Sequence, residues 1–236
     1  MAERLLEIKD LKKYYGKGDS QVKALDGISF DVYQGEMLVL LGNSGCGKST
    51  LLNIIGGMDS PTEGHVLLRG EDITQYKDKE LTRFRKEKIG FVFQFYNLLP
   101  DLTALENVRL SLSKKDSDHL AEKALESVGL GKEKWKQYPS TMSGGEQQRV
   151  SIARALVKNA EIILCDEPTG ALDDKTGRII LELLQKIVRE QGQTIIIVTH
   201  TTPIADMASR VITLRNGRIE KERVNEHPID AKDILW

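Results

Sequence analysis

A glycine-rich stretch near residue 45 has the spacing of a phosphate-binding loop. The segment GNSGCGKST follows an apolar run, precedes a helical pattern and matches G-x-x-x-x-G-K-[ST]. Its glycines let backbone N–H groups turn inward around phosphate oxygens, and a helix start adds partial positive charge. Lys48 can reach the outer phosphates, and the Ser49 hydroxyl can bind Mg²⁺. We call this segment the phosphate loop; its members are Gly42, Asn43, Ser44, Gly45, Cys46, Gly47, Lys48, Ser49 and Thr50.

An acidic pair supplies the second half of a nucleotide-hydrolysing site. In EIILCDEPTGALD an apolar strand delivers Asp166 to its end, where a carboxylate can hold Mg²⁺ through water. Glu167 follows directly and can orient or deprotonate an attacking water, which contributes about 10²- to 10⁴-fold to a rate. The alternative is a surface acidic pair after a core strand, which the phosphate loop makes the weaker interpretation.

Two further polar residues follow apolar strands. His200 ends TIIIVTH, where it can sense a γ-phosphate, although a lone histidine is more often a cap or loop residue. Gln94 follows IGFVF and can place its amide on Mg²⁺ or on the attacking water; in isolation it would be an ordinary exposed glutamine. We predict catalytic roles for Glu167, His200, Lys48 and Gln94, and metal contacts for Ser49, Gln94 and Asp166.

A second glycine-rich helix start, MSGGEQQRVSIARAL, begins at Met142. One nucleotide has only one γ-phosphate, which the phosphate loop already surrounds. The segment can still bind a γ-phosphate that belongs to another copy of the chain, if two copies face each other head to tail and sandwich two ATP molecules. A capped structural helix is the alternative. The predicted contacts are Ser143, Gly144, Gly145 and Glu146.

Alternating strands and helices must position these residues. Apolar alternation or short buried runs predict strands at Leu6–Leu11, Ile28–Tyr33, Met37–Leu41, His65–Arg69, Ile89–Phe93, Ile162–Cys165 and Thr194–Val198. Helical spacing predicts helices after Lys48, near Asp78–Glu87, over Leu102–Val128, from Gly145, and over Lys175–Glu190. The pattern indicates an α/β fold with a mostly helical insert at about 96–141. Thr103 and Glu106 have capping-box spacing, and RNGR at Arg215–Arg218 predicts a hairpin turn.

Composition bounds the possible partners. The 34 Lys and Arg balance 35 Asp and Glu, so no basic excess indicates nucleic acid as a partner. The apolar runs are too short to cross a bilayer, and MAERLLEIKD is unlike a signal peptide. The two cysteines make neither a disulfide framework nor a metal cluster. We expect a soluble cytosolic protein whose membrane role, if any, comes through a partner.

These motifs together resemble the ATPase of an ABC transporter, over essentially the whole chain to about Ile219. They are Gly42–Thr50, Gln94, Ser143–Gln147, Asp166–Glu167, Ala171–Asp173 and His200. The resemblance implies a P-loop NTPase of ABC type, with a RecA-like core, an antiparallel β subdomain and an α-helical subdomain. It implies an ATPase domain over 1–223, a helical subdomain at about 96–157, a tail over 224–236, and ATP and Mg²⁺ as cofactors.

The resemblance also implies roles for residues that do not belong to the motifs described above. Tyr15 resembles the aromatic that stacks on adenine, with Tyr14 as the alternate and a strand-end tyrosine as the plain interpretation. Asp173 resembles the loop residue that crosses the dimer and couples the two sites. The stretch Gln94–Asn107 resembles the groove for a membrane subunit's coupling helix. Its apolar residues are docking candidates or equally subdomain core: Phe95, Tyr96, Leu98 and Leu99.

Several segments are similar to the subgroup of macrolide exporters, lipoprotein-release ATPases and cell-division ATPases, with bacitracin-type peptide-resistance transporters as close relatives. They are GGMDSPTEG, IGFVFQFYNLLPDLTALENV and DEPTGALD. This implies transmembrane permease partners with a large extracytoplasmic domain and a place at the cytoplasmic face of the cell membrane. Two alternatives are ATPases of DNA maintenance, which insert a long coiled coil where 48 residues lie here between Gln94 and Ser143, and translation ATPases, which carry two such domains.

Four positions depart from the common family pattern: Glu146, Thr201, Cys165 and Cys46. Thr201 stands where aspartate is common, which leaves the support of His200 open. Cys46 at a helix start can have a lowered pKa and oxidise readily, although a small residue that simply fits is the favoured interpretation. The tail VNEHPIDAKDILW carries Ile229, Ile234, Leu235 and Trp236, and we expect it to dock on its own domain or on the membrane partner rather than fray.

Overall fold

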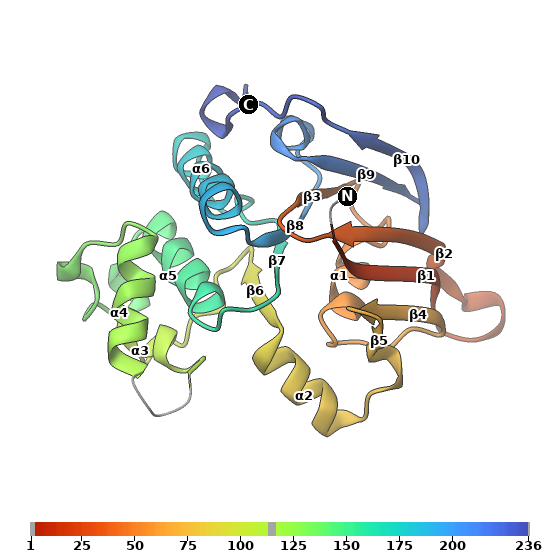
Figure 1. The fold of residues 1–236 in the computed structure, drawn as a ribbon, viewed down its shortest axis with the longest axis horizontal. Coiled ribbons are helices and arrows are strands. Elements are labelled where there is room, and N and C mark those ends of the chain that lie inside the picture. Colours follow the sequence, from red (N-terminus) through yellow and green to blue (C-terminus); the bar gives the residue numbers. More distant parts are fainter. Residues whose placement is uncertain (1–2, 113–116, 236) are drawn as a thin grey trace.

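A six-stranded sheet forms the centre of the molecule (Figure 1). The structure is a computed structural model and describes residues 3–112 and 117–235. The strand order is β10-β9-β3-β8-β7-β6, and every neighbouring pair is parallel except β10 with β9. The strands are β3 (Met37–Leu41), β6 (Ile89–Phe93), β7 (Ile162–Asp166), β8 (Thr194–Thr199), β9 (Arg210–Arg215) and β10 (Arg218–Val224).

Both faces of this sheet are buried. On β3, Met37 and Val39 join one apolar cluster with the helical side of the molecule, whereas Leu38 and Leu40 join another. Figure 1 shows α5 and α6 on one side of the sheet, with α1 and a second sheet on the other. Burial on both faces explains why the strands read as continuous apolar runs. The helices are α1 (Lys48–Ile55), α2 (Asp78–Glu87), α3 (Ala104–Arg109), α4 (Ser117–Ser127), α5 (Gly144–Leu156) and α6 (Asp174–Gln191).

The second sheet is antiparallel and has the order β2-β1-β4-β5. Its strands are β1 (Arg4–Tyr15), β2 (Val22–Tyr33), β4 (Glu63–Leu68) and β5 (Glu71–Asp72). The predicted strands Leu6–Leu11 and Ile28–Tyr33 are parts of the longer strands β1 and β2. The sheet confirms the antiparallel β subdomain.

The helical subdomain differs from its prediction in one respect. The pattern over Leu102–Val128 predicts continuous helix, but the chain leaves α3 in a turn after Arg109 and starts α4 at Ser117. The capping box at the start of α3 is confirmed: Thr103 Oγ1 accepts from the Glu106 N–H at 3.4 Å, and Glu106 Oε2 accepts from the Thr103 N–H at 2.9 Å. In the part of the chain that the structure describes, no helix combines the length and apolar character of a membrane span.

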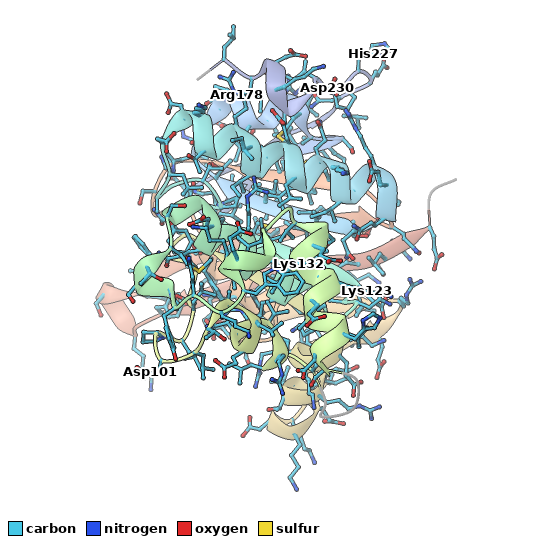
Figure 2. All side chains as sticks on the ribbon, turned by 90° about the vertical axis from the view of Figure 1, so that its left-hand side faces the viewer. Asp101, Lys123, Lys132, Arg178, His227 and Asp230 are labelled. Atoms are coloured by element: carbon cyan, nitrogen blue, oxygen red, sulfur yellow. The ribbon has the colours of Figure 1, made fainter. Side chains whose placement is uncertain are left out.

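The tail docks on its own domain, along α6 (Figure 2). Gln185 of α6 donates from Nε2 to the Ile229 carbonyl at 2.8 Å and accepts from the Ala231 N–H at 3.0 Å. Arg189 Nη1 lies 2.6 Å from Asp230 Oδ1, and Ile234 is 1% exposed. Trp236 lies outside the described residues.

Candidate functional site

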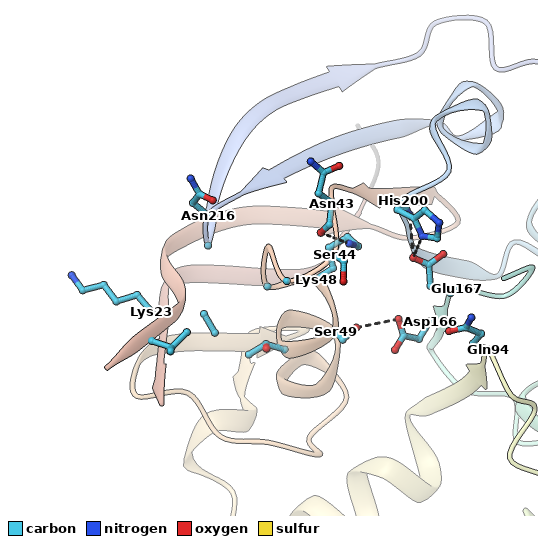
Figure 3. Close-up of a pocket in the computed structure, with 16 residues that line it drawn as sticks. Lys23, Asn43, Ser44, Lys48, Ser49, Gln94, Asp166, Glu167, His200 and Asn216 are labelled. Atoms are coloured by element: carbon cyan, nitrogen blue, oxygen red, sulfur yellow. Dashed lines mark hydrogen bonds and ion pairs between the residues drawn. The ribbon is translucent and has the colours of Figure 1, made fainter. Parts of the chain in front are cut away.

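The carboxyl ends of β3, β6, β7 and β8 meet at one edge of the central sheet, beside a cavity of about 790 Å³ (Figure 3). Side chains that follow neighbouring parallel strands converge at such an edge. Most of the predicted site residues line this cavity: Asn43, Ser44, Gly45, Gly47, Lys48, Ser49, Thr50, Gln94, Asp166, Glu167 and His200.

The phosphate loop turns from β3 into α1 and depends on its glycines. Gly47 has φ +105° and precedes the first residue of α1, and a Cβ there would lie 2.3 Å from the Ala24 carbonyl oxygen. A Cβ on Gly42 would lie 2.5 Å from the Leu214 carbonyl oxygen. Larger side chains at either position would therefore push neighbouring backbone apart.

Lys48 lies inside the loop and is 7% exposed. Its Nζ donates to the Gly42 carbonyl at 2.7 Å and to the Asn43 carbonyl at 2.9 Å. Cys46 is 8% exposed, and its Sγ lies 2.6 Å from the position of a Cβ on Gly42. This close packing supports the interpretation of Cys46 as a small residue that fits. Cys46 and Gly42 line an adjoining cavity of about 520 Å³.

Ser49 and Asp166 face each other across the floor of the site. Ser49 Oγ donates to Asp166 Oδ1 at 3.3 Å (Figure 3). Burial raises the pKa of Asp166, and the charge of the adjacent Glu167 raises it further. A cation beside the two neighbouring carboxylates would stabilise their ionised forms, because it offsets both the partial burial and their mutual repulsion. With the Gln94 amide on the same wall, the oxygen donors are of the kind that Mg²⁺ prefers, so these residues fit the ion.

Glu167 is held in a fixed position. Its backbone has φ +47°, a left-handed conformation that is uncommon outside glycine. Its Oε1 accepts from the His200 N–H at 3.1 Å and lies 2.7 Å from His200 Nδ1, while Oε2 accepts from Thr199 Oγ1 at 3.0 Å. Thr201 supports this corner by donating its N–H to Thr199 Oγ1 at 3.0 Å. The imidazole is therefore oriented by Glu167.

Gln94 directly follows β6 and packs against Gly170, a position without a side chain. Its Nε2 lies 2.8 Å from where a Cβ on Gly170 would stand. A side chain at Gly170 would displace the Gln94 amide from the cavity wall. The glycine that follows Asp166 and Glu167 therefore helps to place the third polar residue.

The second glycine-rich helix start lies elsewhere. Ser143 caps α5, and its neighbours Gly144 and Gly145 pack tightly, with virtual Cβ positions 2.6 Å from Tyr96 Oη and 2.5 Å from Thr176 Cγ2. Asp173 caps α6 by accepting from the Thr176 N–H at 3.0 Å. The structure thus places the starts of α5 and α6 side by side, in contact through Thr176. The predicted residues at these two helix starts do not line the cavity: Ser143, Gly144, Gly145, Glu146 and Asp173.

Tyr15 also lies outside the cavity lining. Its hydroxyl donates to Asp59 Oδ2 at 2.8 Å, and the residue is 44% exposed. Burial and the Asp59 hydrogen bond raise the pKa of Tyr15. The alternate, Tyr14, donates to Asp26 Oδ1 at 2.8 Å, and Lys23 Nζ lies 5.4 Å from its ring centroid.

The sequence motifs do not include five of the residues that line the cavity: Val22, Lys23, Ala24, Asn216 and Gly217. The last two form the hairpin tip between β9 and β10, with φ +50° and +74°, as in a type I′ turn. Gly217 donates its N–H to the Cys46 carbonyl at 3.1 Å, which places the tip against the phosphate loop. The sequence predicts this turn, but nothing in its spacing says that the turn docks there.

Solved structures and known sequences are similar to this chain over most of its length. The ABC transporter ATP-binding protein MJ0796 of Methanocaldococcus jannaschii is 44% identical over 226 residues, which cover 92% of this chain and 96% of that protein. Its dimeric post-hydrolysis structure, bound to ADP and Pi, matches with a TM-score of 0.86 at 42% identity, over 94% of this chain and 100% of that chain.

Two further relatives and a family profile complete the comparison. An ABC transporter ATP-binding protein of Thermotoga maritima is 48% identical, over 92% of this chain and 94% of that protein. The macrolide export ATP-binding/permease protein MacB of Hyphomonas neptunium is 43% identical over 96% of this chain, which spans only 36% of MacB. The ABC transporter family profile matches residues 25–170. The chain therefore belongs to the ABC transporter family, and it is an ATP-binding ATPase unit with the fold of that family.

Proposed function

We propose that two copies of this chain form a head-to-tail dimer that sandwiches two ATP molecules and drives a membrane transporter. Each ATP lies between the phosphate loop of one copy and Ser143–Gly145 of the other. The observation that carries the proposal is that Ser143 and its glycines start a helix outside the cavity that contains Lys48. The dimeric ADP- and Pi-bound structure of MJ0796 supports the same assembly here.

The predicted site residues have distinct roles in this proposal. The phosphate loop, from Gly42 to Thr50, surrounds the phosphates with backbone N–H groups, and Lys48 exchanges its two carbonyl contacts for phosphate oxygens. Tyr15 stacks on the adenine, and Asp173 meets the second copy across the dimer. Ser49, Asp166 and Gln94 hold Mg²⁺, which neutralises charge on the β- and γ-phosphates when bound.

Glu167 is the group that receives the proton of the attacking water. His200 contacts the carboxylate through Nδ1, and in its imidazolium form it also donates to the γ-phosphate from Nε2. Ser143 of the second copy binds the same phosphate, so water can attack only when both copies are in place. General-base help of this kind contributes about 10²- to 10⁴-fold.

The energy of γ-phosphate contacts is large enough to open and close a dimer. A hydrogen bond to a charged group contributes about 1.5–3 kcal/mol. Three such bonds at each of two sites contribute roughly 9–18 kcal/mol before their costs. Shifting a two-state equilibrium from 1:99 to 99:1 needs about 5.5 kcal/mol. Loss of the γ-phosphate can therefore reopen the dimer and move an attached membrane subunit.

The membrane partner docks, we propose, on the segment from Gln94 to Asn107. Phe95 and Leu99 are 73% and 49% exposed, whereas Tyr96 and Leu98 are partly buried, so the segment splits into an outward and an inward set. Arg154 of α5 holds the segment by donating to the Tyr96 carbonyl at 2.8 Å and to the Asn97 carbonyl at 2.5 Å. A coupling helix seated on the outward set would therefore bear on α5.

The partner is a permease with a large extracytoplasmic domain, and the complex works in export, lipoprotein release or antimicrobial-peptide resistance at the cytoplasmic face of the membrane. Similarity to the ATPase part of MacB supports this class. The ATPase domain spans 1–223, with the helical subdomain at about 96–157 and the tail at 224–236. β10 ends at Val224, within one residue of the last boundary.

Mixing two inactive variants tests the shared site. Lys48→Ala removes the phosphate loop's cation, and Ser143→Arg blocks the corner that faces the other copy. Each variant alone should hydrolyse ATP at background rate, whereas a mixture of the two should gain at least about tenfold, because half of the pockets in a mixed dimer are intact. Failure of the mixture to gain activity, with mixed dimers verified by differential tagging, would rule out the sandwich.

A further inference from the structure

The region around Ser143 contains an ion pair that the proposed function does not use. Lys134 Nζ lies 3.0 Å from Glu146 Oε1, and Glu146 is the third residue of α5. We infer that Lys134 is a positioning residue that neutralises Glu146, so that Ser143 can accept the triphosphate of the second copy. The inference rests on the proposed function.

Glu146 occupies the donors that a phosphate would need. Its Oε2 accepts from the Ser143 N–H at 2.8 Å and from the Ser143 hydroxyl at 3.0 Å. Ser143 Oγ in turn accepts from the Glu146 N–H at 3.3 Å. A γ-phosphate that binds at Ser143 therefore competes with the Glu146 carboxylate for the Ser143 N–H and the Ser143 hydroxyl.

This carboxylate is ionised at neutral pH. Partial burial acts to raise the pKa of Glu146, but the hydrogen bonds from the Ser143 backbone and from Lys134 outweigh it, and the pKa lies below its usual value. Two anions on one pair of donors repel each other, and the repulsion is stronger in a dimer seam than in bulk water. A cation beside Glu146 offsets this repulsion.

Lys134 is placed to supply that cation without covering Ser143. It contacts Oε1 and leaves Oε2 to the serine. Its backbone belongs to a short helix, η3 (Lys132–Lys134), and the next residue, Trp135, is 8% exposed and donates from Nε1 to the Leu130 carbonyl at 3.1 Å. The ammonium group therefore comes from an anchored segment.

Lys132 offers a matched control on the same short helix. Its side chain, labelled in Figure 2, is 76% exposed, and its Nζ lies 3.0 Å from Glu126 Oε1 instead of contacting Glu146. Replacing Lys132 with methionine removes the same charge from η3 and leaves the Lys134–Glu146 ion pair in place. An effect of overall charge would appear in both lysine variants, whereas the inferred effect belongs to Lys134 alone.

The experiment measures ATP-driven dimerisation in chains that also carry Glu167→Gln to slow hydrolysis. Sedimentation at fixed ionic strength gives the MgATP concentration for half-maximal dimer. We expect Lys134→Met to raise it about tenfold or more, and Lys132→Met to leave it unchanged. Glu146→Gln should not raise it, and Lys134→Met with Glu146→Gln should behave like Glu146→Gln alone, because the anion that needed compensation is gone.

Four results would overturn the inference. If Glu146→Gln weakens dimerisation as much as Lys134→Met, the pair is only structural. If the double variant is as weak as Lys134→Met, the lysine acts on the phosphate itself. If Lys134→Met lowers the affinity of the monomer for a fluorescent ATP analogue by the same factor, the effect is not at the seam. If the Glu167→Gln parent forms no dimer with MgATP, the proposed function fails together with the inference.

Discussion

Glu167 shows how a single side chain is prepared for one task. Three polar groups converge on its carboxylate: the His200 N–H, the ring nitrogen Nδ1 of His200 and the Thr199 hydroxyl. Its positive φ turns the chain sharply after Asp166, so that successive carboxylates serve different partners. Backbone strain of this kind persists only where the surroundings over-determine it.

Glu167→Gln should retain ATP, lower turnover about 10²- to 10⁴-fold and accumulate a closed dimer, because an amide keeps the shape but accepts no proton. Phosphate release and size-exclusion chromatography with MgATP measure the two effects. Glu182→Gln, on the exposed face of α6, is the control and should hydrolyse normally. Near-normal hydrolysis by Glu167→Gln would falsify its role as the base.

Asp173 has a structural role that can be separated from a role in the dimer. It caps α6 through the Thr176 N–H, and serine can make the same cap without a charge. Asp173→Ala should lower the melting temperature by about 2–4 °C, whereas Asp173→Ser should leave it unchanged. Loss of cooperativity in ATP hydrolysis by Asp173→Ser, with normal melting, would show that the carboxylate itself acts across the dimer.

The sequence predicts the residues of the cavity where their spacing is short. Lys48 and Ser49 lie within one loop, and Asp166 and Glu167 are adjacent, so local pattern alone indicates their chemistry. Asn216 and Gly217 reach the cavity only because β9 pairs with β3, a contact between distant segments. No spacing in the sequence encodes that approach.

At the scale of elements, the turn after α5 carries a partly buried cation. Lys158 Nζ donates to the Arg85 carbonyl at 3.0 Å and to the Ile89 carbonyl at 2.5 Å. Burial, and to a lesser extent the charge of Arg154, lowers the pKa of Lys158 to about 8. The unfolded chain has a lysine pKa near 10.4.

This difference predicts a pH effect on stability. Below about pH 8 both states bind the proton, and the folded state carries the full cost of burying the charge. Between about pH 8 and 10.4 the folded state has released the proton and the unfolded state has not, so the cost falls. The stability of the wild type relative to Lys158→Met should therefore rise over this range. Urea unfolding from pH 7 to 10 measures it; a flat difference would contradict the buried charge.

Strands and helices differ in how well the sequence predicts their limits. β3 and β6 match their predicted ranges because turns or charged residues bound each apolar run. The helical pattern over Leu102–Val128 gives no sign of the turn after Arg109. Leu112 lies in that region and packs against the core that α3 and α4 share. An apolar residue therefore stands where a helix would also have one, and the sequence pattern does not reveal the turn.

At the scale of the whole molecule, the tail closes the surface of α6 and should contribute to global stability. Ile234 is 1% exposed, whereas the adjacent Leu235 is 84% exposed. Ile234→Ala should lower the free energy of unfolding by about 2–4 kcal/mol, because it leaves a cavity. Leu235→Ala should change it by less than about 0.5 kcal/mol. Urea unfolding of both variants measures the contrast; equal effects would mean that the tail is not seated.

The grip of Arg154 on the Tyr96 and Asn97 carbonyls has a mechanical consequence. In the proposed complex, α5 and the segment after Gln94 move together, with the docked permease at one end and Ser143 at the other. Ser143 binds the ATP that is held by the phosphate loop of the other copy. A force that the permease exerts on one copy would therefore act first on the ATP site of the other copy. The two copies would then hydrolyse ATP in a coordinated way, although no signal passes through the Ser49–Asp166 region of either copy.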